Sequence, residues 1–258
     1  MAKIALMNIF NPQTAHLYTA SLAGVSLTWS FRFEDTAKYL RKWISGPQEA
    51  PEDVRKVVRV SDQELKDWES FGNTIDAFAE FCLLCQQTSE ALLPMDRCVI
   101  HAGAVRFRDK AYLISGGSGV GKSTQIRTLQ ELYSGEVSVI NGDKPVLQAL
   151  PDGSVLVHPS PWNGKEGWHG AEAAPLAGIF LMRRGAENDV RPAEIGFAAP
   201  FLYQQIFQSF TSEDIIKLAG AFEDKMLKNV PAYHFTNKEV PESTRLLMDT
   251  MEALSHGI

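Results

Sequence analysis

The chain has 258 residues, enough for one large domain or two small ones, and its 45% hydrophobic and 22% charged residues are ordinary for a soluble globular protein. The formal net charge of −6 argues against a broad nucleic-acid surface, which needs a dense basic patch. The first residues, MAKIALMNIFNPQ, carry no signal-peptide pattern, and no stretch approaches the roughly 18 apolar residues of a membrane span. We therefore expect a cytoplasmic protein without a membrane or nucleic-acid partner.

In chain order, the first predicted elements are two β-like runs and a short amphipathic stretch. The runs cover 16–20 and 25–33, and residues 33–43 predict a helix that is ended by the Gly-Pro pair at 46–47. The polar, proline-rich segment 46–56 is typical of a surface loop.

Two further helices are predicted before residue 95. Ser61, with Glu64 three residues on, forms a capping-box pattern that starts a helix over 61–68. Residues 74–93 are apolar around much of a helical circumference, which predicts a well-buried helix ended by Pro94.

That apolar run contains two of the three cysteines of the chain, which are Cys82, Cys85 and Cys98. Cys82 and Cys85 form a C-x-x-C pair, but a zinc site needs a second pair, and a redox motif sits at a turn that opens a helix. Because the pair lies inside the run instead, we expect it to pack in the core.

Near residue 96 the composition changes, because glycines become more frequent and short β-rich runs follow. We therefore predict an N-terminal α+β domain, 1–95, and a second domain, 96–258. In the second domain two β-like runs flank a turn at 108–110, and a glycine-rich loop follows. The remaining predicted elements are helix 122–132, strand 137–140, a hairpin over 145–159 with its turn at 151–153, strand 176–182, helices 200–210 and 212–227, strand 232–235 and helix 241–254.

The glycine-rich loop GGSGVGKS has the G-x-x-x-x-G-K-S spacing of a P-loop, between a β-like and a helical run as that motif requires. Glycines permit positive φ and let a phosphate approach the backbone, while the helix N-terminus adds positive potential. Lys122 can reach the β- and γ-phosphates, Ser123 can coordinate Mg²⁺, and Thr124 is placed for the α-phosphate. We therefore predict a nucleotide site formed by Gly116, Gly117, Ser118, Gly119, Val120, Gly121, Lys122, Ser123 and Thr124.

Three further features are candidates for chemistry beside this loop. Asp143 follows the apolar strand VSVI, which we expect to lie beside the glycine-loop strand, as the strand of a Walker B acid does. Asp143 could hold Mg²⁺ through water or accept a proton; it could also be a simple turn residue. His101 comes one strand before the glycine loop and is either functional or structural. The segment SPWNGKEGWHG, 160–170, is either an active-site loop or a packed surface loop, with Glu166 as a possible metal ligand and Lys165 as a possible phosphate contact.

Taken in order, IHAGAV, LISGGSGVGKST, VINGDKPVL and SPWNGKE resemble the HPr kinase/phosphorylase family and its serine-kinase-like relatives. The resemblance covers residues 97–185. It implies an α/β fold of the phosphoenolpyruvate carboxykinase type, with a P-loop and a mixed sheet.

For the site, the resemblance implies that His101, Lys122 and Asp143 are catalytic, with Asp143 as general base, and that Ser123, Asp143 and Glu166 bind metal. The chain departs from the family pattern where Gly142-Asp143 replaces two adjacent aspartates, and no basic HPr-docking loop is found.

The residues favour this fold over other P-loop classes. The hairpin directly after the predicted Walker B strand indicates a mixed or antiparallel sheet, whereas RecA-like and ABC-type domains continue with parallel βα units. An ABC-type LSGGQ signature and a guanine-binding NKxD motif are both absent from the sequence.

We expect an ATP- and Mg²⁺-dependent kinase that phosphorylates a hydroxyl group on a small molecule or a peptide. One alternative is a nucleotide-binding regulator or scaffold with little catalysis. A less favoured alternative is a carboxykinase-like enzyme, which the basic residues Lys165, Arg183 and Arg184 keep open. The N-terminal domain could shape acceptor specificity or form a homo-oligomer contact.

Overall fold

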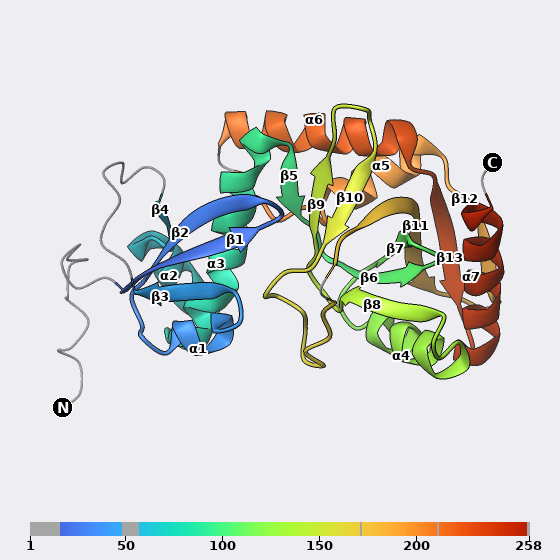
Figure 1. Cartoon of the computed structure of the whole chain (residues 1–258), viewed down its shortest axis with the longest axis horizontal. Helices are drawn as coiled ribbons and strands as arrows, with labels where there is room; N and C mark the ends of the chain where they lie inside the picture. Colours follow the sequence, from blue (N-terminus) through green and yellow to red (C-terminus); the bar gives the residue numbers. More distant parts are fainter. Residues whose placement is uncertain (1–15, 48–56, 171, 211, 257–258) are drawn as a thin grey trace. The chain divides into compact units, whose positions relative to one another are not determined.

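The computed structural model describes residues 16–47, 57–170, 172–210 and 212–256. Contacts within the chain divide it into two units, Met1–Ala91 and Leu92–Ile258, each with its own sheet (Figure 1). The N-terminal stretch without a signal pattern and most of the predicted loop 46–56 lie outside the described residues.

The first unit contains a four-stranded sheet in the order β3-β1-β2-β4. A tight turn at Ala23 and Gly24, both with positive φ, joins the first two strands, and only the pair β2 and β4 is parallel. The elements of this unit are β1 (His16–Leu22), β2 (Val25–Phe31), α1 (Thr36–Leu40), β3 (Ile44–Pro47), β4 (Val57–Arg59), α2 (Asp62–Ser70) and α3 (Ala77–Leu92).

The two predicted strands and the predicted capping box of this unit are confirmed. The Ser61 hydroxyl accepts the Glu64 N–H, and the Glu64 carboxylate accepts the Ser61 N–H. The helix predicted over 33–43 is wrong at its C-terminal end, because the chain turns after Leu40 and Ile44 pairs with Ala20 of β1. The Gly-Pro pair therefore lies in β3 instead of ending a helix.

Helix α3 is confirmed as an element, and it supplies much of the buried surface of the first unit. The Trp29 indole donates to the Thr88 hydroxyl at 3.1 Å. Cys85 is fully buried, as predicted for the C-x-x-C pair, whereas Cys82 is only partly buried. The buried Glu80 carboxylate accepts the N–H groups of Arg32 and Phe33. The helix is not buried on every side, since Phe78 is 51% exposed.

The second unit contains a mixed nine-stranded sheet with the order β5-β9-β10-β11-β7-β6-β8, and β13 pairs with both β11 and β12. The parallel pairs are β11 with β7 and β11 with β13; the other pairs are antiparallel. The strands are β5 (Arg97–Val99), β6 (Ala102–Phe107), β7 (Lys110–Ser115), β8 (Val137–Asn141), β9 (Val146–Ala149), β10 (Val155–His158), β11 (Ala174–Arg184), β12 (Asp189–Pro192) and β13 (Ala232–Asn237).

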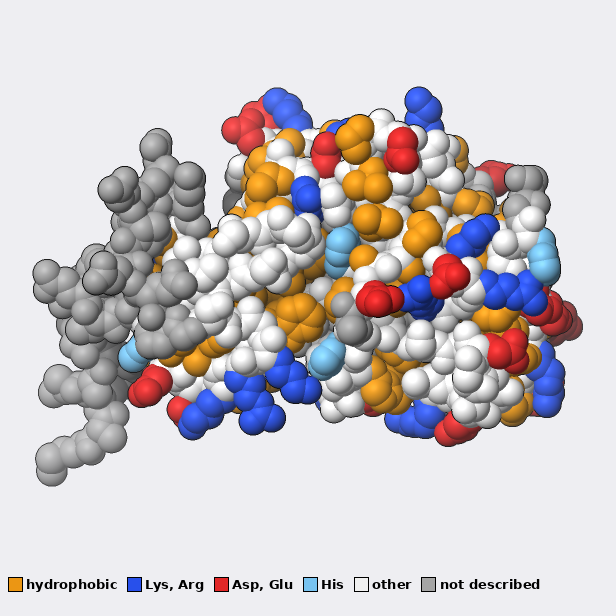
Figure 2. Space-filling view, viewed as in Figure 1, with side chains coloured by type: hydrophobic (Ala, Val, Ile, Leu, Met, Phe, Trp, Pro, Cys, Tyr) orange, Lys and Arg blue, Asp and Glu red, His pale blue; other side chains and the backbone are white. Residues whose placement is uncertain are grey.

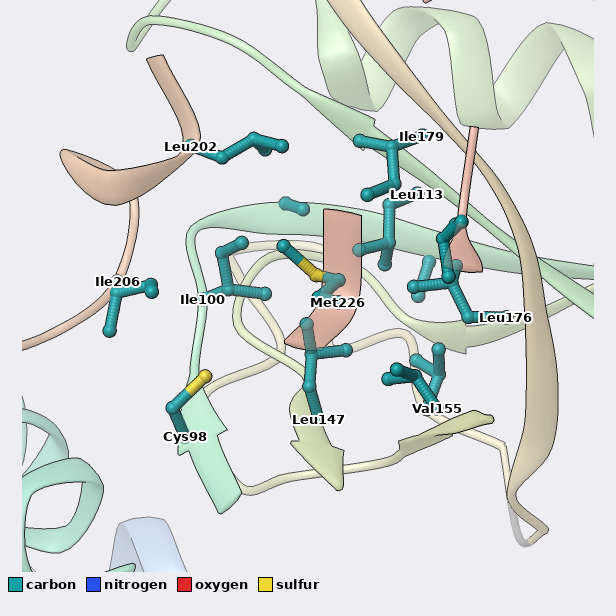
Figure 3. Packing of buried hydrophobic residues seen from close by; sticks show 14 of the residues in the cluster. Cys98, Ile100, Leu113, Leu147, Val155, Leu176, Ile179, Leu202, Ile206 and Met226 are labelled. Carbon is teal, nitrogen blue, oxygen red and sulfur yellow. The ribbon is translucent and has the colours of Figure 1, made fainter. Parts of the chain in front are cut away.

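Helices cover both faces of this sheet, and the alternation along its central strands shows which face each residue takes. Ile114 and Phe180 pack in a cluster with residues of α4 and α7, while their neighbours Leu113 and Ile179 pack in a cluster with residues of α5 and α6. Figure 3 shows the second of these clusters, with Met226 of α6 against the sheet. The helices are α4 (Lys122–Leu132), α5 (Ile195–Tyr203), α6 (Glu213–Asn229) and α7 (Val240–Ser255), and a 3₁₀ turn, η2, spans Leu93–Met95.

The predicted hairpin, the helix Lys122–Leu132 and the mixed α/β character of this unit are confirmed. Two expectations need correction. The helix predicted over 200–210 ends at Tyr203, because Gln205 and Phe207 pair with the chain near His101 instead. The strand that carries Asp143 does not lie beside the glycine-loop strand, since β6 separates β8 from β7.

Acidic and basic side chains are interspersed on the face of the second unit that Figure 2 shows. Among the described helices, none combines the length and the hydrophobicity that crossing a membrane requires.

Candidate functional site

The sheet topology brings three separate segments of the second unit to one edge. Strand β6 runs antiparallel to both β7 and β8, with Ala102 opposite Ser115 and Ala104 opposite Asn141. The start of β6 therefore meets the ends of the other two strands. His101 precedes β6, the glycine loop follows β7, and Asp143 follows β8, so all three lie together.

Hydrogen bonds join these segments directly. The Ala102 N–H donates to the Asp143 carbonyl at 2.9 Å, and the Ser115 hydroxyl donates to the His101 carbonyl at 3.0 Å. The His101 N–H donates to the Gln205 carbonyl at 2.8 Å, so the segment after α5 also lies next to His101.

The glycine loop makes its turn with backbone conformations and contacts that side chains would prevent. Gly119 and Gly121 have φ of 74° and 114°, in the left-handed region that glycine tolerates best. At Gly116 a Cβ atom would lie 2.6 Å from the Met182 carbonyl oxygen. The loop therefore needs glycine for its own geometry, and Gly117, Ser118 and Gly119 are exposed at its tip.

Helix α4 starts immediately after this loop, and its N-cap residue, Gly121, provides no side-chain cap. The N–H groups in the first turn of a helix have no acceptor within the helix. The N–H groups of Lys122, Ser123 and Thr124 are therefore available to bind an anion, and the helix dipole favours negative charge there. Ser123 is half-buried and Thr124 is exposed.

The Lys122 side chain folds back across the loop. Its Nζ donates to the carbonyls of Gly116 and Gly117 at 2.8 and 3.2 Å, and the residue is only 8% exposed. Burial lowers the pKa of its ammonium, while the nearby Asp143 carboxylate acts in the opposite direction. Lys122 therefore places a fixed positive charge beneath the exposed tip of the loop.

Asp143 is held from both sides. Its Oδ1 lies 3.4 Å from His101 Nε2, and its Oδ2 accepts a hydrogen bond from Lys144 Nζ. Burial alone would raise the pKa of this carboxyl, but the hydrogen bond from His101 and the charge and hydrogen bond of Lys144 lower it to about 2. The group is therefore ionised at any physiological pH.

Asn141, at the end of β8, fixes the turn that carries Asp143. Its Oδ1 accepts the N–H groups of Asp143 and Lys144 at 3.0 and 2.7 Å, and its Nδ2 donates to the Ser160 carbonyl at 3.0 Å. The Ser160 hydroxyl in turn donates to the Lys144 carbonyl. Because Asn141 and Ser160 are fully buried, this network ties the segment 160–170 to the Asp143 turn.

The segment 160–170 crosses directly over Gly142. A Cβ atom there would lie 2.5 Å from the Asn163 carbonyl oxygen, and the Gly142 N–H donates to the Trp168 carbonyl at 2.9 Å. The space beside Gly142 is therefore filled by another part of the chain, and a second carboxylate cannot point into the site from position 142.

Glu166 reaches the same neighbourhood from this segment. A Cβ atom on Gly164 would lie 3.6 Å from Glu166 Oε2 and 3.8 Å from Asp143 Cγ, so both carboxyl groups flank this glycine. Glu166 Oε1 is 3.6 Å from Arg127 of α4, whose guanidinium also lies over the Trp168 ring.

Asp143 and Glu166 are the described carboxylates that could hold Mg²⁺ at this site. Among the described residues no three His, Cys, Asp or Glu side chains form a cluster that could hold a metal by themselves. Mg²⁺ does not need one, because it keeps several waters and is often bound by one or two carboxylates together with substrate phosphates. Asp143 and Glu166, on either side of Gly164, suit that mode.

Three residues of the site were not singled out from the sequence: Asn141, Ser160 and Lys144. The Asn-Gly pair signals a turn, and this signal could have identified Asn141. Nothing local distinguishes Ser160 or Lys144, because their roles depend on the crossing of two segments that are distant in sequence.

Comparison with solved structures finds a similarity to the Hpr(Ser) kinase/phosphatase from Coxiella burnetii, with 10% sequence identity and a TM-score of 0.36. The similarity covers 62% of this chain and 99% of that one. No family model matches the chain, and no curated protein matches it. The functional argument therefore depends on the residues of the site.

Proposed function

We propose that the chain is a phosphotransferase that moves the γ-phosphoryl group of ATP to a hydroxyl acceptor, a small molecule or a peptide serine. The observation that carries the proposal is the meeting of the glycine loop, the ionised Asp143 and His101 at one edge of the sheet. A loop that binds phosphates, next to a carboxylate that can take a hydroxyl proton, is the minimum a kinase needs.

The residues divide into binding and catalytic roles. The amides of the loop and of the first turn of α4 bind the phosphates, and Lys122 places its charge at the β- and γ-phosphates. Ser123, Asp143 and Glu166 would hold Mg²⁺, which neutralises negative charge on the phosphates when it is bound.

In the reaction, the acceptor oxygen forms a bond to the γ-phosphorus while the bond from that phosphorus to the β,γ-bridging oxygen breaks and ADP leaves. The hydroxyl proton passes to Asp143. A carboxylate with a pKa of about 2 is a weak base, so its main contribution is to hold and orient the hydroxyl. His101 acts through Asp143 by fixing Oδ1, and it is a positioning residue.

The second candidate function is a nucleotide-binding regulator with little catalysis. It is favoured by the fact that both oxygens of Asp143 are already engaged, one by His101 and the other by Lys144. A regulator would bind ATP through the same loop but would show no acceptor-dependent turnover.

A phosphoryl-transfer screen tests the proposal. The protein is incubated with Mg²⁺ and labelled ATP over a pool of metabolites and peptides, and mass spectrometry identifies species that gain one phosphoryl group. We expect a product whose rate falls about 100-fold or more in Asp143→Asn. Asp189→Asn, which removes an exposed carboxylate paired with Arg191, is the matched control and should keep the wild-type rate.

Calorimetric titration with ATP separates the outcomes of this screen. If ATP binds and the wild type phosphorylates nothing with any donor, the regulator function replaces the kinase. A product that forms equally fast in Asp143→Asn shows that this carboxylate has no role in transfer.

A further inference from the structure

Lys144 is the residue of the site that the proposed mechanism does not use, and its backbone is fixed on both sides. Its N–H donates to Asn141 Oδ1 at 2.7 Å, and its carbonyl accepts the Ser160 hydroxyl. Both partners are fully buried. The backbone of Lys144 is therefore anchored at both its N–H and its carbonyl, although the residue lies outside the strands.

The side chain is directed into the site and remains partly accessible. Its Nζ contacts Asp143 Oδ2 and lies 5.7 Å from the centre of the Phe207 ring. Its side chain is 26% exposed, compared with 24% for Asp143. An ammonium held between a carboxylate and an aromatic face still has a donor available for a third partner, because it carries three N–H groups.

Lys144 also lies at the same edge of the sheet as the glycine loop. Its partner Asp143 accepts the Ala102 N–H at its carbonyl, and Ala102 is paired with Ser115, the residue directly before the loop. The two lysines therefore reach one edge of the sheet, where a single polyanionic ligand can contact both.

The charged side chains at this edge of the sheet do not cancel. Lys122, Lys144 and Arg127 carry three positive charges, whereas Asp143 and Glu166 carry two negative ones, which leaves one positive charge in excess. A second carboxylate at position 142 is blocked by the Asn163 carbonyl. The phosphates of a nucleoside triphosphate would supply negative charge here.

We propose that Lys144 is a second phosphate-binding lysine, which contacts the terminal phosphate of the bound nucleoside triphosphate. The proposal rests on the proposed function, in that the glycine loop binds ATP. Because Lys144 Nζ contacts Asp143, the carboxylate that would take the acceptor proton, Lys144 would reach the phosphoryl group from the acceptor side.

A simpler role is that Lys144 only holds Asp143, and the two roles predict different results in a double-mutant cycle. If the lysine acts only through the carboxylate, its removal has no further effect once Asp143 is neutral. If it contacts phosphate, its removal weakens binding whether or not Asp143 carries a charge.

The experiment measures the Kd for ATP and for AMP by calorimetric titration, with and without Mg²⁺. The variants are Lys144→Met, Lys144→Arg, Asp143→Asn and the double variant Asp143→Asn/Lys144→Met. Lys217→Met is the matched control, because that lysine is exposed on α6 and pairs only with Glu213 in the described structure. Circular dichroism confirms that each variant is folded.

We expect Lys144→Met to weaken ATP binding about tenfold or more in the absence of Mg²⁺, with AMP affected less than threefold. Lys144→Arg should stay within about threefold of the wild type, and the loss should persist in the Asp143→Asn background. Lys217→Met should bind like the wild type.

Two results overturn the proposal while leaving the proposed function intact: unchanged ATP affinity in Lys144→Met, or a loss that disappears in the Asp143→Asn background. If Lys144→Met does not fold, the comparison of ATP with AMP in Lys144→Gln decides in the same way. Absence of ATP binding in the wild type overturns the proposed function and this inference together.

Discussion

Gly142 shows how one residue determines the kind of carboxylate site this chain can have. Its Cα faces the Asn163 carbonyl, where a Cβ atom would be only 2.5 Å from the oxygen, and the Trp168 Cβ is 3.5 Å away on the same side. Backbone atoms cannot give way as the end of a flexible side chain can. The single acid of this turn therefore follows from the path of the segment 160–170.

We predict that Gly142→Ala destabilises the protein by about 1–3 kcal/mol, because the added methyl group overpacks against backbone. Gly142→Asp should be at least as destabilising and should not strengthen Mg²⁺ binding. Urea denaturation measures the stability of both variants, and calorimetric titration measures Mg²⁺ binding. The control is Gly196→Ala, in helix α5, where a Cβ atom meets nothing within 4 Å. The control should be unchanged or up to about 1 kcal/mol more stable, and equal stabilities of Gly142→Ala and Gly196→Ala would contradict the overpacking.

At the scale of elements, the end of β8 is the point where sheet and site are connected. Asn141 is paired in the sheet opposite Ala104, forms a bridge with His169, and holds the two N–H groups of the turn beyond it. Asn188 does the same for the N–H groups of Lys238 and Glu239, at 2.7 and 3.0 Å, but it is only half-buried.

This pair of asparagines gives a matched prediction. Asn141→Ala should cost about 2–4 kcal/mol, since it leaves buried donors without an acceptor, whereas Asn188→Ala should cost about 1 kcal/mol because water can replace the amide. Asn141→Ala should also weaken ATP binding, because the turn that carries Asp143 and Lys144 is released. Chemical denaturation and ATP titration measure the two effects; similar costs for both variants would show that burial of the Asn141 network is unimportant.

Local patterns predicted those elements whose signals lie within the element itself. The helix over 122–132 has a glycine start and a periodic apolar face, and the capping box at Ser61 is complete in four residues. The helix ends at Leu40 and Tyr203 were predicted too late, because each is set by pairing with a distant strand. Strand β12 was not predicted for the same reason, as it depends on β13.

In the candidate site, too, local patterns identified some residues, whereas others depend on contacts between distant segments. The glycine loop, His101 and Asp143 could be singled out because each stands in a recognisable context along the chain. Their proximity required the antiparallel position of β6 between β7 and β8, which the sequence patterns did not specify. The role of Lys144 depends further on Asn141 and Ser160, which lie 19 residues apart.

At the scale of the whole molecule, the second unit has its candidate site at one edge of the sheet and a buried acid elsewhere. Glu223, on the inner side of α6, is only 6% exposed, and its Oε1 finds no hydrogen-bond donor among the described residues. Burial, and to a lesser extent the neighbouring Asp224, raise its pKa from 4.5 to about 7. The folded protein therefore favours the protonated acid.

This shift predicts a pH dependence of global stability. Between pH 4.5 and 7 the unfolded chain has lost the proton that the folded chain keeps, so the free energy of unfolding decreases as pH rises through this window. Above pH 7 the cost is fully present, on the order of 3 kcal/mol. His158, whose pKa is lowered to about 4 by burial, acts in the opposite direction as pH falls below 6.5, but its contribution is the same in variants of Glu223.

Glu223→Gln removes the titrating group and keeps nearly the same shape. We expect it to be more stable than the wild type at pH 8, by on the order of 3 kcal/mol, and the difference should shrink steadily as pH is lowered to 4.5. Urea denaturation at several pH values measures this difference. Glu213→Gln, on the exposed side of the same helix where the acid pairs with Lys217, should show no such trend. A Glu223→Gln difference that stays constant from pH 4.5 to pH 8 would mean that this carboxyl titrates alike in the folded and unfolded chains, so its burial would not limit the stability of the second unit at neutral pH.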